Sequence, residues 1–258
     1  MKVLLILIDG MRPDAMVQFP AARRVMEQAA YKLEGSTVYP SCTLPCHLSL
    51  FYSRPPLVHG VTNNKYTARV RQKNGIFEWL RKAGKKTAMF YSWEELRDVA
   101  APGSVKASYF VNGLDGSWLQ CNALLTDQCV DALHRNAPDF AFLYLAATDD
   151  AGHRYGWMSP EYMHAMEQSW ACAEKVLNHL PEDYAVIITA DHGGHDKRHT
   201  TFMKEDMTIP VLLLNAGLPT GETVEDYNIM DIAPTVADLL GIEKPLEWAG
   251  KSLLKECK

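Results

Sequence analysis

Short, nearly continuous apolar runs separated by helical stretches constrain this chain more than any other feature of its sequence. These runs are rich in Val, Ile, Leu and Phe, and their apolar residues do not alternate with polar ones, as expected of strands that are covered on both faces. Such strands, alternating with helices, predict a three-layer α/β/α sandwich around a mostly parallel sheet. The runs cover residues 3–8, 87–91, 140–146, 185–189 and 211–214.

Helix signals fall between these runs. The clearest helix begins after Ser159, an N-cap residue followed by Pro160, and we expect it to run to about His179. Two others end at a glycine, the usual stop signal for a helix. The remaining expected helices cover residues 20–30, 76–83, 118–136 and 232–240.

The composition is typical of a globular protein, and the charge argues against one class of binding partner. Hydrophobic residues make up 47% of the 258 residues and charged residues 22%, which allows a sizeable core. No repeat or long linker divides the sequence, so we expect one domain over residues 1–258. The net charge of −5, without a Lys/Arg cluster, argues against binding to a nucleic-acid polymer.

The cysteines and the first residues predict a location. The six cysteines lack the spacing of a zinc ribbon or a disulfide scaffold, and such cysteines are typical of reduced thiols in the cytoplasm. The first apolar run is short and ends at Asp9 without a small-residue cleavage site, which favours a buried strand over a secretion signal. No segment approaches the roughly twenty apolar residues that span a membrane. We therefore expect a cytoplasmic protein that does not bind membranes.

Acidic and imidazole side chains follow three of the predicted strands. Because ligands bind beyond the carboxyl ends of strands in open α/β sheets, we expect these side chains to share one edge. A single Asp could cap a helix and a single His could be a surface residue, but three such strand ends together favour metal binding. The candidate ligands are Asp9, Asp149, His153, Asp191, His192 and His199.

The ligand types indicate which metals would bind. Three Asp and three His without a thiolate suit Zn²⁺ best, with Mn²⁺ or Fe as alternatives, and match Ca²⁺ poorly. Six ligands are too many for one tetrahedral zinc ion. They are about right for two divalent ions that share a site.

Thr43 stands at the start of a helix that we expect over residues 45–52, in a loop bracketed by Pro40 and Pro45. Backbone N–H groups and the helix dipole favour an anion at this position. Thr43 could be a simple N-cap residue. Its hydroxyl is a weak nucleophile unless a base or a metal removes the proton, and the predicted metal site supplies such an activator.

The ordered set of motifs resembles the nucleotide pyrophosphatase/phosphodiesterase branch of the alkaline phosphatase superfamily. The resemblance covers Asp9 to about Leu254 and implies an alkaline phosphatase-like fold with a minimal cap. Leu44 and Cys46 depart from the family pattern, which usually has an aromatic residue and Asn there, and Thr200 stands where Gly is common. The matching segments are residues 9–14, 43–47, 59–64, 149–156, 191–193 and 199, with the tail from 231.

The resemblance also implies roles. Asp9, Asp191 and His192 would hold one metal, which also binds the Thr43 oxygen. Asp149, His153 and His199 would hold the other, and Asn64 would meet a phosphate oxygen. Metal-activated Thr43 would attack phosphorus in line, and water would then hydrolyse the phospho-threonine intermediate.

Several assignments stay open in the sequence. Leu44 and Tyr144 could form the walls of a slot for a nucleotide base, although Tyr144 fits core packing equally well. A ligand swap between His195 and His199 is conceivable, and we favour His199. Cys42 and its neighbour Cys46 are more simply small residues in a tight loop than redox groups.

The expected function is hydrolysis of phosphodiester or pyrophosphate bonds in a small-molecule phosphate ester, with nucleotides among the candidates. A phosphomonoesterase or phosphonate hydrolase could use the same metal core. A non-catalytic metal- or nucleotide-binding homologue is the alternative from another class. The complete ligand set together with Thr43 weighs against this last alternative.

Overall fold

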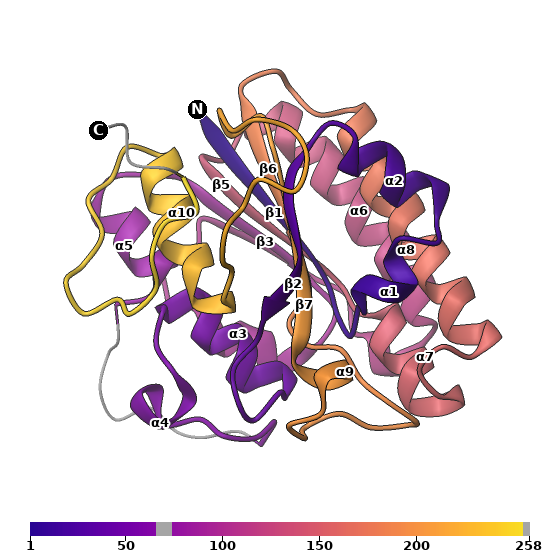
Figure 1. Cartoon of the computed structure of the whole chain (residues 1–258). Helices are drawn as coiled ribbons and strands as arrows, with labels where there is room; N and C mark the ends of the chain where they lie inside the picture. The colour runs from indigo at the N-terminus through magenta and orange to yellow at the C-terminus, as the bar shows by residue number, and fades with distance from the viewer. Residues whose placement is uncertain (66–73, 255–258) are drawn as a thin grey trace.

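A seven-stranded sheet forms the centre of the computed structural model, which describes residues 1–65 and 74–254 (Figure 1). Its strand order is β2-β7-β6-β1-β5-β3-β4. Every neighbouring pair is parallel except those of β7, which runs antiparallel to β6 and β2, so the expected mostly parallel sheet is confirmed. The strands are β1 (Lys2–Ile8), β2 (Ala30–Ser36), β3 (Thr87–Tyr91), β4 (Ala107–Phe110), β5 (Phe140–Leu145), β6 (Tyr184–Thr189) and β7 (Thr208–Leu214).

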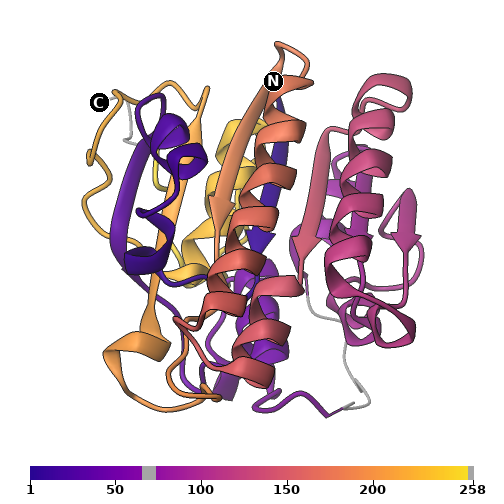
Figure 2. The same cartoon turned by 90° about the vertical axis from the view of Figure 1, so that its right-hand side faces the viewer.

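Helices cover both faces of this sheet (Figures 1 and 2), which confirms the three-layer sandwich. One face carries α1 (Pro13–Met16), α2 (Pro20–Met26), α6 (Trp118–Arg135), α7 (Ala147–Tyr155) and α8 (Pro160–Asn178). The other carries α3 (Thr43–Tyr52), α5 (Ile76–Lys82) and α10 (Ile232–Leu239). The short helices α4 (Pro56–His59) and α9 (Lys204–Met207) lie at the carboxyl edge of the sheet. The described part of the chain also contains the 3-10 helices Glu94–Val99, Gly113–Asp115 and Ile229–Asp231.

The central strands are buried along their whole length, which explains their continuous apolar runs. No residue of β5 or β6 is exposed, because helices cover the sheet on both sides. Helix α8 presents its buried residues at helical spacing and begins as expected, with the Ser159 hydroxyl accepting from the Tyr162 N–H at 3.2 Å. The buried residues of α8 are Tyr162, Ala165, Met166, Ser169, Trp170, Ala173 and Val176.

Two expectations are corrected by the observed elements. The helix expected over residues 20–30 ends at Met26, because the chain turns and enters edge strand β2 at Ala30. The run expected over residues 140–146 ends at Leu145 and leads at once into α7, which the sequence did not predict.

Among the described residues, none of the helices has the length and apolar character needed to cross a membrane. The five cysteines of that part of the chain are free thiols. Cys257 lies outside the described residues.

Candidate metal centre

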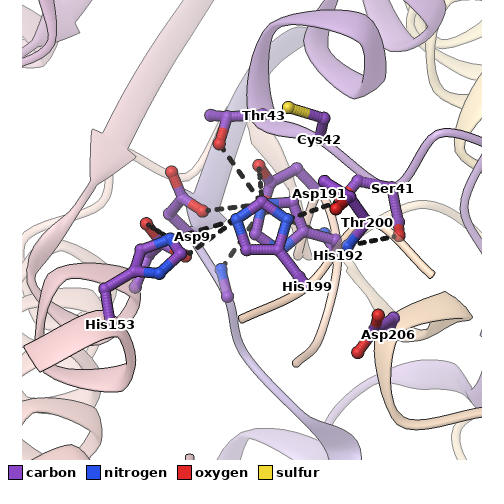
Figure 3. A network of polar contacts seen from close by, with 12 residues as sticks. Asp9, Ser41, Cys42, Thr43, His153, Asp191, His192, His199, Thr200 and Asp206 are labelled. Carbon is purple, nitrogen blue, oxygen red and sulfur yellow. Dashed lines mark hydrogen bonds and ion pairs between the residues drawn. The ribbon is translucent and has the colours of Figure 1, made fainter. Parts of the chain in front are cut away.

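The carboxyl ends of three neighbouring strands bring the predicted ligands together. β1 pairs in parallel with β5 and β6, so that Ile8 lies opposite Leu145 and Leu7 lies opposite Thr189. The segments that follow these strands therefore leave the sheet at nearly the same level, as the sequence predicted. Figure 3 shows the convergence of Asp9, His153, Asp191, His192 and His199, and Asp149 lies among them.

Helix α7 carries two members of one ligand group. Asp149 and His153 are one helical turn apart and project from the same face. The Nε2 atom of His153 lies 3.5 Å from Asp149 Oδ2 and 3.1 Å from His199 Nε2. The ligand atoms of these three residues all lie within 4.8 Å of one another, so a single ion could contact all of them.

A second group surrounds His192. Its Nε2 atom lies 3.5 Å from Asp9 Oδ1, and 3.3 Å from both Asp191 Oδ2 and Thr43 Oγ1. The compact set within 4.8 Å consists of Asp9, His192 and Asp149. Asp149 therefore faces both groups, whereas the family resemblance places Asp191 rather than Asp149 with Asp9 and His192.

The three histidines share one orientation. The Nδ1 atom of each faces a backbone carbonyl oxygen, which can only accept, so each Nδ1 carries the proton and donates it. Each Nε2 atom therefore turns a lone pair toward the cluster, as metal-bound histidines do. For His153 and His199 these lone pairs face each other across 3.1 Å, which is unfavourable without a cation between them. The acceptors for His192, His199 and His153 are the carbonyl oxygens of Gly193, Ser41 and Lys197, at 2.8, 2.6 and 3.1 Å.

Within the part of the chain that the structure describes, the carboxylates of the cluster have no Lys or Arg partner. Asp9 Oδ1, Asp149 Oδ1 and Asp191 Oδ2 are buried and have no hydrogen-bond partner among the described residues. Burial, followed by repulsion from Asp191 and Asp149, raises the pKa of Asp9 well above its usual value. Burial and the neighbouring Asp149 raise the pKa of Asp191 to about 7. Divalent cations would remove this cost, so the donor set fits metal ions.

Thr43 is the first residue of α3 and is 4% exposed. The Oδ1 atom of Asn64 accepts from the Leu44 N–H at 2.9 Å and from the Cys42 thiol at 3.1 Å. The amide group of Asn64 is thus anchored beside the start of the helix, and its NH₂ end is the one left to donate. The structure therefore brings the Thr43 hydroxyl, the Thr43 N–H and the NH₂ group of Asn64 to one place at the start of the helix, where an anion is favoured.

The burial of Leu44 and Tyr144 argues against their assignment to a base slot. Each side chain is only 3% exposed, so neither offers a face on which a ring could stack. The Tyr144 hydroxyl instead donates to Asp9 Oδ2, and its ring packs edge-on against His47. Tyr144 therefore orients a predicted ligand, and Leu44 belongs to the core.

The turn after β1 depends on residues that the sequence did not single out. The carbonyl oxygen of Gly10 accepts from Trp157 Nε1 and from the Tyr162 hydroxyl, each at 3.0 Å. Gly10 has a φ of +68°, and a Cβ there would lie 3.1 Å from the Asp149 Cα. Glycine suits both this backbone conformation and this close approach, and Gly10 was the sequence signal for the turn.

His195 lies outside both ligand groups. Its Nδ1 atom is 2.6 Å from Asp206 Oδ1, and its Nε2 accepts from Arg198 Nε at 3.3 Å. Asp206 is fully buried and also accepts from the N–H and hydroxyl of Thr201, at 2.9 and 2.7 Å. The geometry thus brings His199 to the cluster, and His195 helps Asp206 to hold the loop that carries His199.

The two cysteines beside Thr43 are buried thiols. Burial, followed by the charge of Asp191, raises the pKa of Cys42 to about 11 and that of Cys46 well above its usual value. The Thr37 hydroxyl donates to Cys46 Sγ at 3.2 Å. Both thiols stay protonated at neutral pH, in agreement with their interpretation as small packing residues.

Comparison with known proteins gives a family match over most of the chain. The sequence profile described as type I phosphodiesterase / nucleotide pyrophosphatase matches residues 3–211. The 2,3-bisphosphoglycerate-independent phosphoglycerate mutase of Flavobacterium psychrophilum is 33% identical over 140 residues, which are 50% of this chain and 26% of the mutase. The match thus spans about a quarter of the length of this curated relative.

Solved structures share the fold. Murine ectonucleotide pyrophosphatase / phosphodiesterase 5 has a TM-score of 0.78 at 15% identity, over 94% of this chain and 96% of that chain. The phosphonate monoester hydrolase of Silicibacter pomeroyi has a TM-score of 0.74 at 18% identity, over 98% of this chain and 75% of that chain. The expected alkaline phosphatase-like fold is confirmed.

Proposed function

The chain belongs to the type I phosphodiesterase / nucleotide pyrophosphatase family, and from that premise we propose that it hydrolyses phosphodiester or pyrophosphate bonds with Thr43 as the nucleophile. The family supports a phosphoryl-transfer hydrolase of the alkaline phosphatase superfamily. The bond, the nucleophile and a small-molecule substrate such as a nucleotide are our inference.

The orientation of the three histidines carries this proposal. Their Nδ1 protons are donated to backbone carbonyls, so the Nε2 atoms converge with three carboxylate oxygens that have no hydrogen-bond partner in residues 1–65 and 74–254. Left without cations, such a cluster combines lone-pair repulsion with three acids in a buried site. A structural role alone would not require this arrangement, whereas a two-metal phosphoryl-transfer site does.

Two divalent ions, most simply Zn²⁺, fit this donor set. Asp149, His153 and His199 would hold one ion. Asp9, Asp191 and His192, with the Thr43 hydroxyl, would hold the other. Bound ions of this kind neutralise the carboxylates and act as Lewis acids toward substrate oxygens.

The chain's own groups account for the remaining chemistry. Thr43 Oγ1 gives its proton to solvent water and attacks phosphorus. The P–O bond to the leaving group breaks with its electron pair on the departing oxygen, which takes up a proton from solvent. The NH₂ group of Asn64 and the N–H of Thr43 bind the non-bridging phosphate oxygens. Water then attacks phosphorus, which breaks the bond to Thr43 Oγ1 and restores the hydroxyl.

A substrate comparison tests the proposal. Protein reconstituted with Zn²⁺ or Mn²⁺ should bind about two ions per chain and should cleave bis-p-nitrophenyl phosphate faster than p-nitrophenyl phosphate. Thr43→Ala should keep its metals and lose turnover, whereas the control Thr126→Ala, a buried hydroxyl in α6 that donates to Asn122 O at 2.7 Å, should stay active. Substantial activity in Thr43→Ala would exclude Thr43 as nucleophile. A faster rate with the monoester would favour the phosphomonoesterase alternative.

A further inference from the structure

Two loops at the candidate site are joined by contacts that centre on Ser41. Its carbonyl oxygen accepts from His199 Nδ1 at 2.6 Å, and its hydroxyl accepts from the Thr200 N–H at 3.2 Å and donates to the Thr201 carbonyl at 3.4 Å. Figure 3 shows Ser41 between the start of α3 and the segment of His199 and Thr200. The loop before Thr43 and the loop after His199 therefore form one unit.

This unit ends in two stacked aromatic rings. The rings of Tyr39 and Phe202 lie 3.7 Å apart, centroid to centroid, with 15° between their planes. Tyr39 is 46% exposed and Phe202 is 73% exposed, so the pair presents a flat apolar surface to solvent. A single exposed apolar residue needs no explanation, but two parallel rings fixed to both loops of a catalytic site are an ordered feature.

We propose that the Tyr39/Phe202 platform, meaning the stacked rings of these two residues, binds an aromatic or similarly planar apolar group of the ester substrate. This inference rests on the proposed function. It assigns to the platform the substrate-binding role that the buried side chains of Leu44 and Tyr144 do not provide.

Chain length limits the distance between the platform and the candidate site. Phe202 follows His199 by three residues, and Tyr39 precedes Thr43 by four. Even fully extended chains of these lengths keep the Cα atoms within about 10 and about 14 Å of each other, respectively.

The stacking geometry defines the ligand chemistry. Among the described residues the Tyr39 and Phe202 rings cover one face of each other, so that a third ring would add to the outer face in offset or edge-on contact. Such a contact accepts purine, pyrimidine and simple aryl rings alike, because each of these rings offers a π face. The platform would therefore favour aryl or nucleoside esters over esters of small alcohols.

Calorimetric titration with two phosphonates tests this without turnover. Phenylphosphonate and methylphosphonate are titrated into the metal-reconstituted full chain, and the ratio of their affinities is compared between variants. Phe202→Ala should lower the phenyl-to-methyl affinity ratio by about two- to tenfold, and Phe202→Trp should preserve or raise it. Leu114→Ala, at a residue that is 76% exposed in a different part of the chain, is the matched control and should leave the ratio unchanged.

The outcomes separate this inference from the proposed function. If Phe202→Ala binds methylphosphonate and keeps the wild-type phenyl-to-methyl affinity ratio, the proposed role of the platform is wrong, while the proposed phosphoryl site stands. An unchanged ratio together with a dimer-to-monomer change in sedimentation would assign the rings to a subunit contact instead. If neither phosphonate binds the metal-loaded wild type, the proposed function fails and this inference fails with it.

Discussion

The Nε2 atoms of His153 and His199 lie 3.1 Å apart while the Nδ1 atom of each donates to a backbone carbonyl. Neither imidazole can relieve this contact by changing its tautomer, because that would break its Nδ1 hydrogen bond. The fold therefore turns the Nε2 atoms of two rings that are 46 residues apart in sequence toward each other, and this contact needs a proton or a metal ion between them. A bound cation turns this repulsion into coordination, so the loop that carries His199 and helix α7 are expected to become more stable on metal binding.

Replacement of His199 should weaken metal binding more than replacement of His195. His199→Ala removes a donor from the Asp149/His153 group, whereas His195→Ala removes only a partner of Asp206. We expect the loss for His195→Ala to stay at or below the roughly 10- to 100-fold typical of outer-sphere changes, and the loss for His199→Ala to exceed it. Competition against a chromophoric chelator measures both affinities. A larger loss of metal affinity in His195→Ala than in His199→Ala would identify His195 as the ligand instead.

The Tyr144 hydroxyl should matter for metal affinity rather than only for stability. Tyr144→Phe leaves the buried Asp9 Oδ2 without its donor, so the carboxylate loses both orientation and a compensating hydrogen bond. We expect metal affinity at the Asp9 group to fall by about 10- to 100-fold. Tyr184→Phe is the control, because its hydroxyl donates at 2.7 Å to the Pro138 carbonyl and touches no ligand. Equal metal affinities in Tyr144→Phe and Tyr184→Phe would show that Tyr144 contributes only to packing.

The central strands could be predicted from sequence because their burial on both faces leaves a continuous apolar run. Edge strand β2 (Ala30–Ser36) was missed because it mixes exposed and buried residues and contains few apolar ones. Edge strand β4 (Ala107–Phe110) was missed because it is only four residues long and none of them is buried. Helix α7 (Ala147–Tyr155) was missed for a different reason. Its Asp and Gly residues are typical of a loop, and tertiary packing against α8 overrides that local preference.

The convergence of the candidate ligands could be predicted because each follows a recognisable strand, but their supporting contacts could not. Ser41 meets His199 across 158 residues of sequence, and Trp157 meets Gly10 across 147. No local pattern encodes such contacts. The same holds for Tyr144. The sequence predicts its position on a buried strand, but not the hydrogen bond from its hydroxyl to Asp9.

The buried imidazole of His47 should make the protein less stable in mild acid. Burial lowers the pKa of His47 to about 4, whereas the unfolded chain has a value near 6.5. Between these values the unfolded state binds the extra proton, so stability is complete above about pH 6.5 and is lost as the pH falls toward 4. By pH 5 this amounts to about 2 kcal/mol.

A variant isolates this contribution from the other titrating groups, including Asp191, whose Oδ2 lies 3.6 Å from His47 Nδ1. His47→Asn keeps a donor for the Thr43 carbonyl, which accepts from His47 Nδ1 at 2.8 Å, and removes the titration. In urea unfolding of the metal-loaded protein, the stability advantage of wild type over His47→Asn should shrink by about 2 kcal/mol from pH 7 to pH 5. A constant difference would show that His47 is not held neutral.

Thr200 should be a source of backbone strain. It has a φ of +82° directly after His199, and a β-branched residue is disfavoured in that left-handed region by about 1–2 kcal/mol. Glycine removes this strain but costs about 0.5–1 kcal/mol in chain entropy. Thr200→Gly should therefore raise the free energy of unfolding by up to about 1 kcal/mol. The Thr200 N–H that donates to Ser41 is kept, so metal affinity should change little.

The matched control for this strain is Thr220→Gly, at an exposed threonine whose φ is not positive. There the entropy term acts alone, so this variant should be destabilised by about 0.5–1 kcal/mol. Urea unfolding with excess chelator, and again with Zn²⁺, measures both variants. Opposite signs for the two substitutions in both conditions would locate the strain in the Thr200 backbone itself. Equal destabilisation would mean that the surrounding contacts, rather than the threonine, determine this conformation.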